Sequence, residues 1–274
     1  MQRNRSVASA TPVHSGTTEA AIEAHPLIIA RESKHGPAGP ARPGPTVAAA
    51  SFAHPGNGSP LPLLAAAETA CLAAIASIIC LAKGARIYEE GDQAHSIYIV
   101  IKGEVKTFRA LSSGRCRVTA FLSAGDLAGL GENGLYVSTA QALTPLITYR
   151  LPLNALDQML RSDPALEHCF LCKLWHDLRA ARAHAIMLGR HDAQGKLAMF
   201  LRERDAHKPV ASPLASRIVL PMTRSDVADY LGLSLEAVSR SFHKLQQDGI
   251  IGLDDRHTVQ IVDRTRFEKL AAAT

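Results

Sequence analysis

The segment GLSLEAVSRSFHKLQQDGII, residues 232–251, carries three polar side chains that could act together: Glu236, Ser239 and Arg240. Residues three and four apart share one face of an α-helix, so these three would project from the same side. A carboxylate accepts a hydrogen bond from a cytosine amino group, a guanidinium binds guanine through two bonds, and a hydroxyl serves either role. The set therefore suits base reading, although it also suits a plain surface helix with one intrahelical ion pair.

The neighbouring sequence favours base reading. The other side of the expected helix is apolar at helical spacing. Its members are Leu235, Val238, Phe242 and Leu245. Just upstream, RSDVADYLG predicts a second short helix that Thr223 can cap, with Asp226 three residues further on as in a capping box. Gly232 follows where a left-handed residue would end that helix.

Two short helices joined by GLS predict a helix-turn-helix. A strand in SRIVLPM and a β-hairpin in DGIIGLDDRHTVQIVD flank them, which makes the unit a winged one, and RTRFEKLAAA predicts a last short helix. The second helix then has one buried side and one free polar face, which can enter a DNA groove. Lys244 and Arg224 are expected to lie along the DNA phosphates. The shared core is expected to contain Val227, Ala228, Leu231, Leu233, Val238 and Leu245.

A different pattern fills the middle of the chain. Glycines recur every 11 or 12 residues, at Gly91, Gly103, Gly114 and Gly125, between β-branched and aromatic runs. This rhythm predicts short antiparallel strands joined by tight turns, with a hairpin at ALSSGRC and the last strand ending near Leu151. Before it, the Ala- and Leu-rich stretch over residues 61–81 predicts one or two short helices.

After Pro152 the period becomes helical again. Ser162 or Asp163 can cap, Pro164 suits a first turn, and the helical pattern then runs to Gly189. A helix of that length spans about 39 Å and carries an apolar stripe, so it should pack against a second copy. The alternative is a helix that lies along its own β-domain. The stripe consists of Leu166, Phe170, Leu174 (or Cys169 and Trp175), Leu178, Ala181, Ala185 and Leu188.

Net charge, cysteine content and the length of apolar stretches restrict the possible functions less than the motifs do. A net charge of +5 is too small to indicate a nucleic-acid partner by itself, and five scattered cysteines indicate a reducing cytoplasm rather than a disulfide framework. No stretch reaches the roughly 18 apolar residues of a membrane span. We expect four regions: a disordered extension over 1–60, a β-domain over 61–160, a long helix over 161–190 and a winged helix-turn-helix over 191–274.

The order of these regions resembles the Crp/Fnr superfamily of bacterial transcription regulators, over about residues 65–270. The stretch LPMTRSDVADYLGLSLEAVSRSFHKLQQDGII is similar to the DNA-binding signature of its FixK-like branch. The resemblance implies an α+β fold with a cyclic-nucleotide-binding-type β-roll, a dimerisation helix and a winged helix-turn-helix. It also implies an activator that works with RNA polymerase as a homodimer, in which Glu236, Ser239 and Arg240 read bases. Leu235 replaces an Arg of the cyclic-AMP-receptor type, which favours a TTGA half-site.

The sensory input is less clear from the sequence. Gly131-Glu132 could imitate a phosphate-binding pair, but Val137 and Ser138 stand where a cation is needed, so we expect no cyclic nucleotide. No cysteine cluster suits an iron–sulfur centre, and no histidine spacing predicts a metal site. Cys169 and Cys172 fit small apolar positions near a dimer seam, with a redox or metal role as the alternative.

The sequence contains neither a nucleophile elbow nor a phosphate loop, so we expect neither an enzyme nor a cofactor. The second hypothesis is a small-molecule sensor whose C-terminal domain mediates protein contacts. A protein-contact helix would not need the Glu-x-x-Ser-Arg pattern of residues 236–240.

Overall fold

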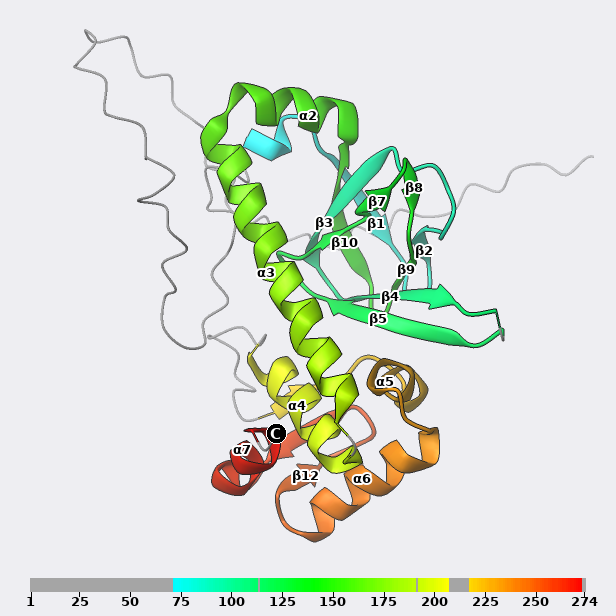
Figure 1. Ribbon diagram of the computed structural model, residues 1–274, viewed down its shortest axis with the longest axis vertical. Coiled ribbons are helices and arrows are strands. Elements are labelled where there is room, and N and C mark those ends of the chain that lie inside the picture. Colours follow the sequence, from blue (N-terminus) through cyan, green and yellow to red (C-terminus); the bar gives the residue numbers. More distant parts are fainter. Residues whose placement is uncertain (1–70, 113, 191, 207–216, 273–274) are drawn as a thin grey trace, which may run out of the picture. The chain divides into compact units, whose positions relative to one another are not determined.

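The computed structural model describes residues 71–112, 114–190, 192–206 and 217–272 (Figure 1). The predicted disordered extension over 1–60 lies outside these residues. By its contacts the chain divides into Met1–Ser51 and Phe52–Thr274, and every described residue belongs to the second unit. None of the described helices has the length and apolar character needed to cross a membrane.

The first part of the described chain is a β-roll of two four-stranded antiparallel sheets. Their strand orders are β1-β10-β3-β6 and β2-β9-β4-β5, and a small hairpin of β7 and β8 lies beside them (Figure 1). The strands are β1 Ser77–Leu81, β2 Arg86–Tyr88, β3 Ser96–Lys102, β4 Val105–Ala110, β5 Cys116–Leu122, β6 Leu127–Ala128, β7 Gly131–Glu132, β8 Leu135–Tyr136, β9 Thr139–Ala142 and β10 Leu146–Pro152.

The recurring glycines make the turns that the sequence predicts. Gly91, Gly103, Gly114 and Gly125 have φ angles of 89°, 99°, 76° and 91°, a region that residues with a Cβ rarely adopt. At Gly103 a Cβ would also lie 2.5 Å from the backbone oxygen of Pro145. Gly114 closes the predicted hairpin between β4 and β5, where its N–H donates to the oxygen of Leu111.

The prediction of helix up to residue 81 is wrong in its second half. Residues 71–73 are helical, but Ser77–Leu81 is the strand β1 and pairs with β10 along its whole length. The Ala-rich composition before it suggested a helix. The pairing with β10, about 70 residues away, overrides that local preference because it satisfies the backbone of an otherwise open sheet edge.

Two helices follow the β-roll: α2, Leu153–Ser162, and α3, Pro164–Gly189. The predicted cap is confirmed, since the Asp163 side chain accepts from the N–H groups of Ala165 and Leu166, and Pro164 occupies the first turn. The apolar stripe of α3 divides in two. Leu166 and Phe170 pack into the core of the β-roll. The side chains left exposed further along are Leu171, Leu174, Trp175, Leu178, Ile186 and Leu188.

The remaining elements form the winged helix-turn-helix. A three-stranded sheet of order β11-β13-β12 lies beside the helices. The elements are α4 Ala193–Ala206, β11 Arg217–Val219, α5 Arg224–Leu231, α6 Leu235–Gln247, β12 Ile251–Leu253, β13 Thr258–Ile261 and α7 Arg264–Ala272. Thr223 and Asp226 form the expected capping box, and Gly232 ends α5 in the left-handed region with φ 64°. All of these local predictions are confirmed.

The core of this domain continues into the β-roll. Val118 and Phe121 of β5 are buried in the same apolar cluster as Phe200 of α4 and Tyr230 of α5. The Phe121 ring lies 5.1 Å from the Tyr230 ring between centroids, in a tilted arrangement. Consequently β5 packs directly against the helix-turn-helix, so a displacement of β5 would act on the helix-turn-helix through these contacts.

Candidate nucleic-acid interface

Helix α6 has one buried face and one free face, as its sequence requires. Val238, Phe242 and Leu245 are at most 3% exposed and belong to the core. Glu236, Ser239 and Arg240 are all exposed. The structure therefore brings the three predicted base readers together on the open side of a helix that is anchored along its opposite side.

Leu235 departs from the predicted apolar face of α6. Its side chain is 49% exposed, whereas the apolar spacing placed it with Val238 and Phe242. Leu235 is the first residue of α6, directly after the capping residue Ser234. An exposed apolar side chain next to Glu236 becomes part of the free face.

The start of α6 is electrostatically fixed. The Ser234 hydroxyl accepts from the N–H of Ala237 at 3.1 Å and caps the helix as predicted. The pKa of the Glu236 carboxyl is lowered, chiefly by hydrogen bonds from its own N–H and from the Ser234 hydroxyl, and least by the positive charge of Arg240. Glu236 thus stays charged, as an acceptor for a cytosine amino group must be.

Arg224 lies in a less open position than the sequence suggested. Its guanidinium sits over the Phe242 ring at 3.3 Å from the centroid, which ties the first residue of α5 to the middle of α6. Burial lowers the pKa of Arg224 to about 10. Among the described residues, its Nη1 is buried and has no hydrogen-bond partner.

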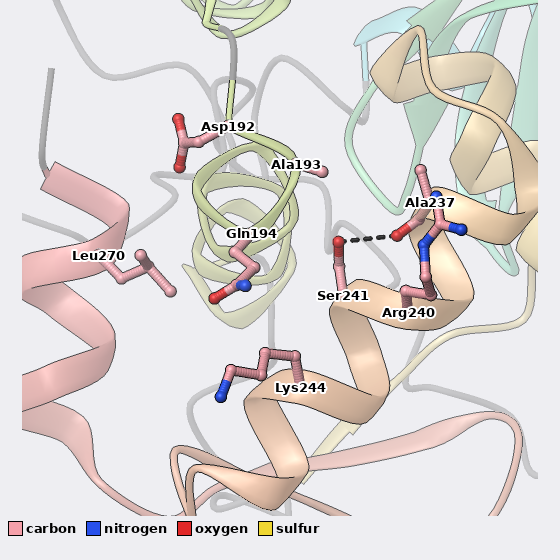
Figure 2. A pocket seen from close by; sticks show the side chains of 8 residues that line it. All are labelled: Asp192, Ala193, Gln194, Ala237, Arg240, Ser241, Lys244 and Leu270. Carbon is pink, nitrogen blue, oxygen red and sulfur yellow. Dashed lines mark hydrogen bonds between the residues drawn. The ribbon is translucent and has the colours of Figure 1, made fainter.

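Lys244 stands beside an open hollow of about 560 Å³ between α6, the first turn of α4 and the end of α7. Its ammonium pairs with Asp248 at 2.9 Å, but its side chain remains 53% exposed. Figure 2 shows Gln194 of α4 and Lys244 at the space between their helices. The lining residues are Asp192, Ala193, Gln194, Ala237, Arg240, Ser241, Lys244 and Leu270.

Sequence reasoning missed both the Arg224–Phe242 stack and the participation of α4 in this surface. No sequence signal could have found the stack, because its partners lie 18 residues apart in different helices. Gln194 could have been suspected only from its place in the first turn of a helix, which many polar residues share.

The interior of the β-roll is filled by tyrosines. The rings of Tyr88 and Tyr136 stack at 4.1 Å, and Tyr98 stacks on Tyr88 at 5.6 Å. Their hydroxyls are engaged with the backbone: Tyr88 accepts from the N–H of Gly129, and Tyr136 donates to the oxygen of Ser96. These groups are polar anchors in the interior, and Arg150, opposite Tyr98 in the pairing of β10 with β3, donates to the Ser96 hydroxyl at 3.0 Å.

The stretch that the sequence compared with a phosphate-binding pair, Gly131-Glu132, lies in an exposed hairpin. Gly131 and Glu132 form one strand of the β7–β8 hairpin and are exposed. Asn133 and Gly134 make its turn, with φ angles of 53° and 78°. Val137 is also exposed, at 39%. Within the described part of the chain no group of His, Cys, Asp and Glu could hold a metal, and neither Cys169 nor Cys172 forms a disulfide there.

Comparisons with known proteins agree with this arrangement. A family profile described as "Cyclic nucleotide-binding domain" matches residues 78–163, and one described as "Crp-like helix-turn-helix domain" matches residues 195–270. The Nitrogen fixation regulation protein FixK of Bradyrhizobium diazoefficiens is 33% identical over 69% of this chain and 80% of its own length. The Transcriptional activator protein FnrA of Stutzerimonas stutzeri is 29% identical over 67% of this chain and 75% of its own. The solved structure of FixK2 from Bradyrhizobium japonicum is 32% identical with a TM-score of 0.67, and the match covers 73% of this chain and 99% of that one.

A β-roll, a long helix with an exposed apolar stripe and a winged helix-turn-helix with a free polar face define a DNA-binding transcription regulator. This chain belongs to the Crp/Fnr family.

Proposed function

We propose that this protein binds, as a homodimer, a DNA palindrome of the type TTGA, spacer, TCAA, and activates transcription there. The observation that carries the proposal is the exposed set Glu236, Ser239 and Arg240 on a helix whose other face is buried. The relationship to FixK at 33% identity supports the half-site type. Because a homodimer has two-fold symmetry, its two α6 helices require half-sites about one helical turn apart.

Each reader has a distinct role in the proposal. Arg240 bonds the edge of a guanine, Glu236 accepts from the cytosine side or braces Arg240, and Ser239 touches a neighbouring base or phosphate. Leu235 presents an apolar side chain where a second cation would favour another half-site, and its 49% exposure supports a place on the reading face.

Two cations flank the readers and are proposed to contact phosphates. The place of Arg224 at the first residue of α5, with its guanidinium over Phe242 of α6, supports such a role. Lys244 reaches the hollow between α6 and α4, past which a phosphate backbone could run. The proposal implies a cytoplasmic protein with RNA polymerase as its partner at promoters.

The dimer is proposed to form along α3. Its exposed apolar residues, from Leu171 to Leu188, need a second copy to cover them, since isolated patches of this size on a long helix are unfavourable in water. The part of α3 that packs on its own β-roll, at Leu166 and Phe170, leaves these residues free for that purpose.

The proposal is tested by selecting binding sites from random DNA with the parent protein, Arg240→Ala and Lys244→Ala. Arg240→Ala should cost about 1–3 kcal/mol per half-site and relax the preference at one base pair. Lys244→Ala is the matched control: it should weaken all sequences alike and lower the salt dependence by about one phosphate. If Arg240→Ala selects the same guanine as the parent, α6 does not read through this residue.

A further inference from the structure

The C-terminal end of α5 is held by side chains from three other elements. The oxygen of Ala228 accepts from the N–H of Leu233, so the turn itself satisfies that group. The three carbonyls that follow have outside donors. Arg117 of β5 donates to Asp229 at 3.1 Å, His184 of α3 donates to Tyr230 at 2.9 Å, and Lys196 of α4 donates to Leu231 at 3.3 Å.

Each of these contacts suits the negative end of a helix. The last carbonyls of a helix lack partners within it, and their dipoles favour positive charge. Arg117 and Lys196 are cations, and His184 must carry its hydrogen on Nε2 because a carbonyl can only accept. The His184 ring also stacks on the Tyr230 ring, at 3.9 Å and 8° between planes. We refer to Arg117, His184 and Lys196 as the α5 clamp.

The turn of the helix-turn-helix, at Gly232, is closely packed by residues of the β-roll and of α3. A Cβ built on Gly232 would lie 3.1 Å from the Arg117 guanidinium and 3.3 Å from Leu188 of α3. The turn that sets the angle between α5 and α6 is thus in contact with both the β-roll and the long helix.

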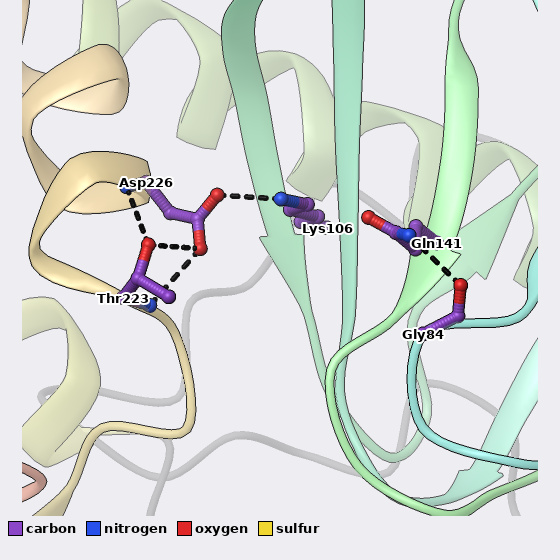
Figure 3. Close-up of polar contacts among 5 residues, drawn as sticks. All are labelled: Gly84, Lys106, Gln141, Thr223 and Asp226. Carbon is purple, nitrogen blue, oxygen red and sulfur yellow. Dashed lines mark hydrogen bonds and ion pairs between the residues drawn. The ribbon is translucent and has the colours of Figure 1, made fainter.

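The N-terminal end of α5 is attached to the β-roll as well. Lys106 of β4 pairs with Asp226 at 2.5 Å, and the same carboxylate closes the capping box with Thr223 (Figure 3). Both partners are largely buried, with side chains 19% and 10% exposed. Helix α5 is therefore fixed at both ends by residues outside the helix-turn-helix.

We infer that the α5 clamp positions α6 relative to α3, and thereby sets the half-site spacing that the dimer accepts. This inference rests on the proposed function, because spacing has meaning only for a dimer on a palindrome. In this proposal α6 reads the bases, whereas the clamp sets the position of each α6 in the dimer. Arg117, His184 and Lys196 act through α5 and do not touch DNA, so they are positioning residues.

The test measures affinity for DNA duplexes with the preferred spacer and with one base pair added or removed. Each added base pair turns a half-site by about a tenth of a helical turn, so a rigidly held pair of α6 helices must discriminate. Arg117→Met should weaken binding to the preferred site by about tenfold and binding to the altered spacers much less, because a charge-assisted hydrogen bond is lost only from the clamped arrangement. The preferred bases within each half-site should not change.

Matched variants separate positioning from other effects. Arg115→Met removes the same charge from an exposed site on the same hairpin and should leave spacer discrimination as in the parent. Arg117→Lys keeps a cationic donor and should retain most of the discrimination. His184→Ala tests the clamp from α3, at a half-exposed position, should Arg117→Met not fold.

The outcomes are distinct. A parent protein that binds no palindrome would overturn the proposed function, and this inference with it. A parent that discriminates between spacers, while Arg117→Met or His184→Ala loses affinity equally for all of them, would overturn the inference alone. In that case the clamp residues only stabilise the fold. A change in the selected bases would instead assign the residue to reading.

Discussion

At the scale of single residues, the polar groups that organise the helix-turn-helix serve two purposes at once. Asp226 caps α5 through Thr223 and also pairs with Lys106 of the β-roll. Arg224, the first residue of α5, places its guanidinium over the Phe242 ring of α6. Because each residue joins a local motif to a distant element, its substitution should affect both stability and the placement of α6.

Asp226 gives the first prediction, about pH. Burial alone would raise the pKa of its carboxyl, but hydrogen bonds from Lys106 and Thr223 outweigh burial and lower it below the ordinary value of 3.8. A lowered folded-state pKa stabilises the protein above the unfolded-state pKa, and this contribution is lost as pH falls through the folded one. Asp226→Asn should therefore reduce the free energy of unfolding at pH 7 by about 1–2 kcal/mol and flatten its decline below about pH 4.

Urea titrations between pH 7 and pH 2 measure this effect. Asp157→Asn is a suitable control, because Asp157 also pairs with a basic residue, Arg161, but at an exposed site where both side chains are at least 60% exposed. Its loss should change stability by less than about 0.5 kcal/mol. Equal effects of the two substitutions would contradict the importance of the buried pair.

At the scale of elements, α3 combines two surfaces that the sequence could not separate. Its first half packs on the β-roll, where buried Lys173 pairs with Asp126 at 2.8 Å and with Asp177 at 3.0 Å. Its second half exposes apolar residues and carries His184 of the α5 clamp. One helix thus links the β-roll, the dimer surface and the helix-turn-helix.

The prediction at this scale concerns dimerisation. Leu178 is 43% exposed in the apolar stripe, so Leu178→Asp would bury a charge in the seam and should raise the dimer dissociation constant by at least about tenfold. Ala180→Asp adds the same charge two residues further on, about 200° around the helix, and should leave the dimer intact. Sedimentation at micromolar concentration distinguishes them. A parent that remains monomeric with and without DNA would contradict the assignment of the seam.

At the scale of the whole molecule, the β-roll has the fold of a cyclic-nucleotide-binding domain, and Gly131, Glu132 and Val137, which the sequence compared with phosphate-binding positions, are exposed. Tyr88, Tyr98 and Tyr136 stack in its interior. Two arginines that could replace the expected cation already have partners: Arg150 donates to the Ser96 hydroxyl beside these tyrosines, and Arg117 donates to α5. A buried phosphate needs such a cation together with backbone donors.

We therefore expect no tight binding of cyclic AMP. Calorimetry with the full-length protein should show no binding in the micromolar range, and the affinity for the palindrome should be the same with and without the nucleotide. A micromolar dissociation constant would contradict this prediction. It would imply that Arg117 or Arg150 leaves its present partner. A shift in DNA affinity on addition of nucleotide would then identify Arg117 as the one that moved, because Arg117 belongs to the α5 clamp and Arg150 does not.

The sequence by itself determined every feature set by neighbours three to five residues apart. The Asp163 cap, the Thr223–Asp226 capping box, the left-handed Gly232 and the hairpin at Gly114 were all predictable, because short-range backbone geometry admits few residue types at these positions. The family resemblance and the polar set on α6 followed from the same local patterns.

Only the tertiary structure decided the features made by distant contacts. Strand β1 exists because β10 pairs with it, and Leu235 is exposed although its spacing placed it on the apolar face of α6. The α5 clamp joins carbonyls of α5 to side chains 35, 46 and 112 residues away. The sequence cannot indicate which backbone carbonyl accepts a side-chain hydrogen bond, since every residue has one. Which donor reaches it is therefore settled only when the β-roll, α3 and α4 pack together.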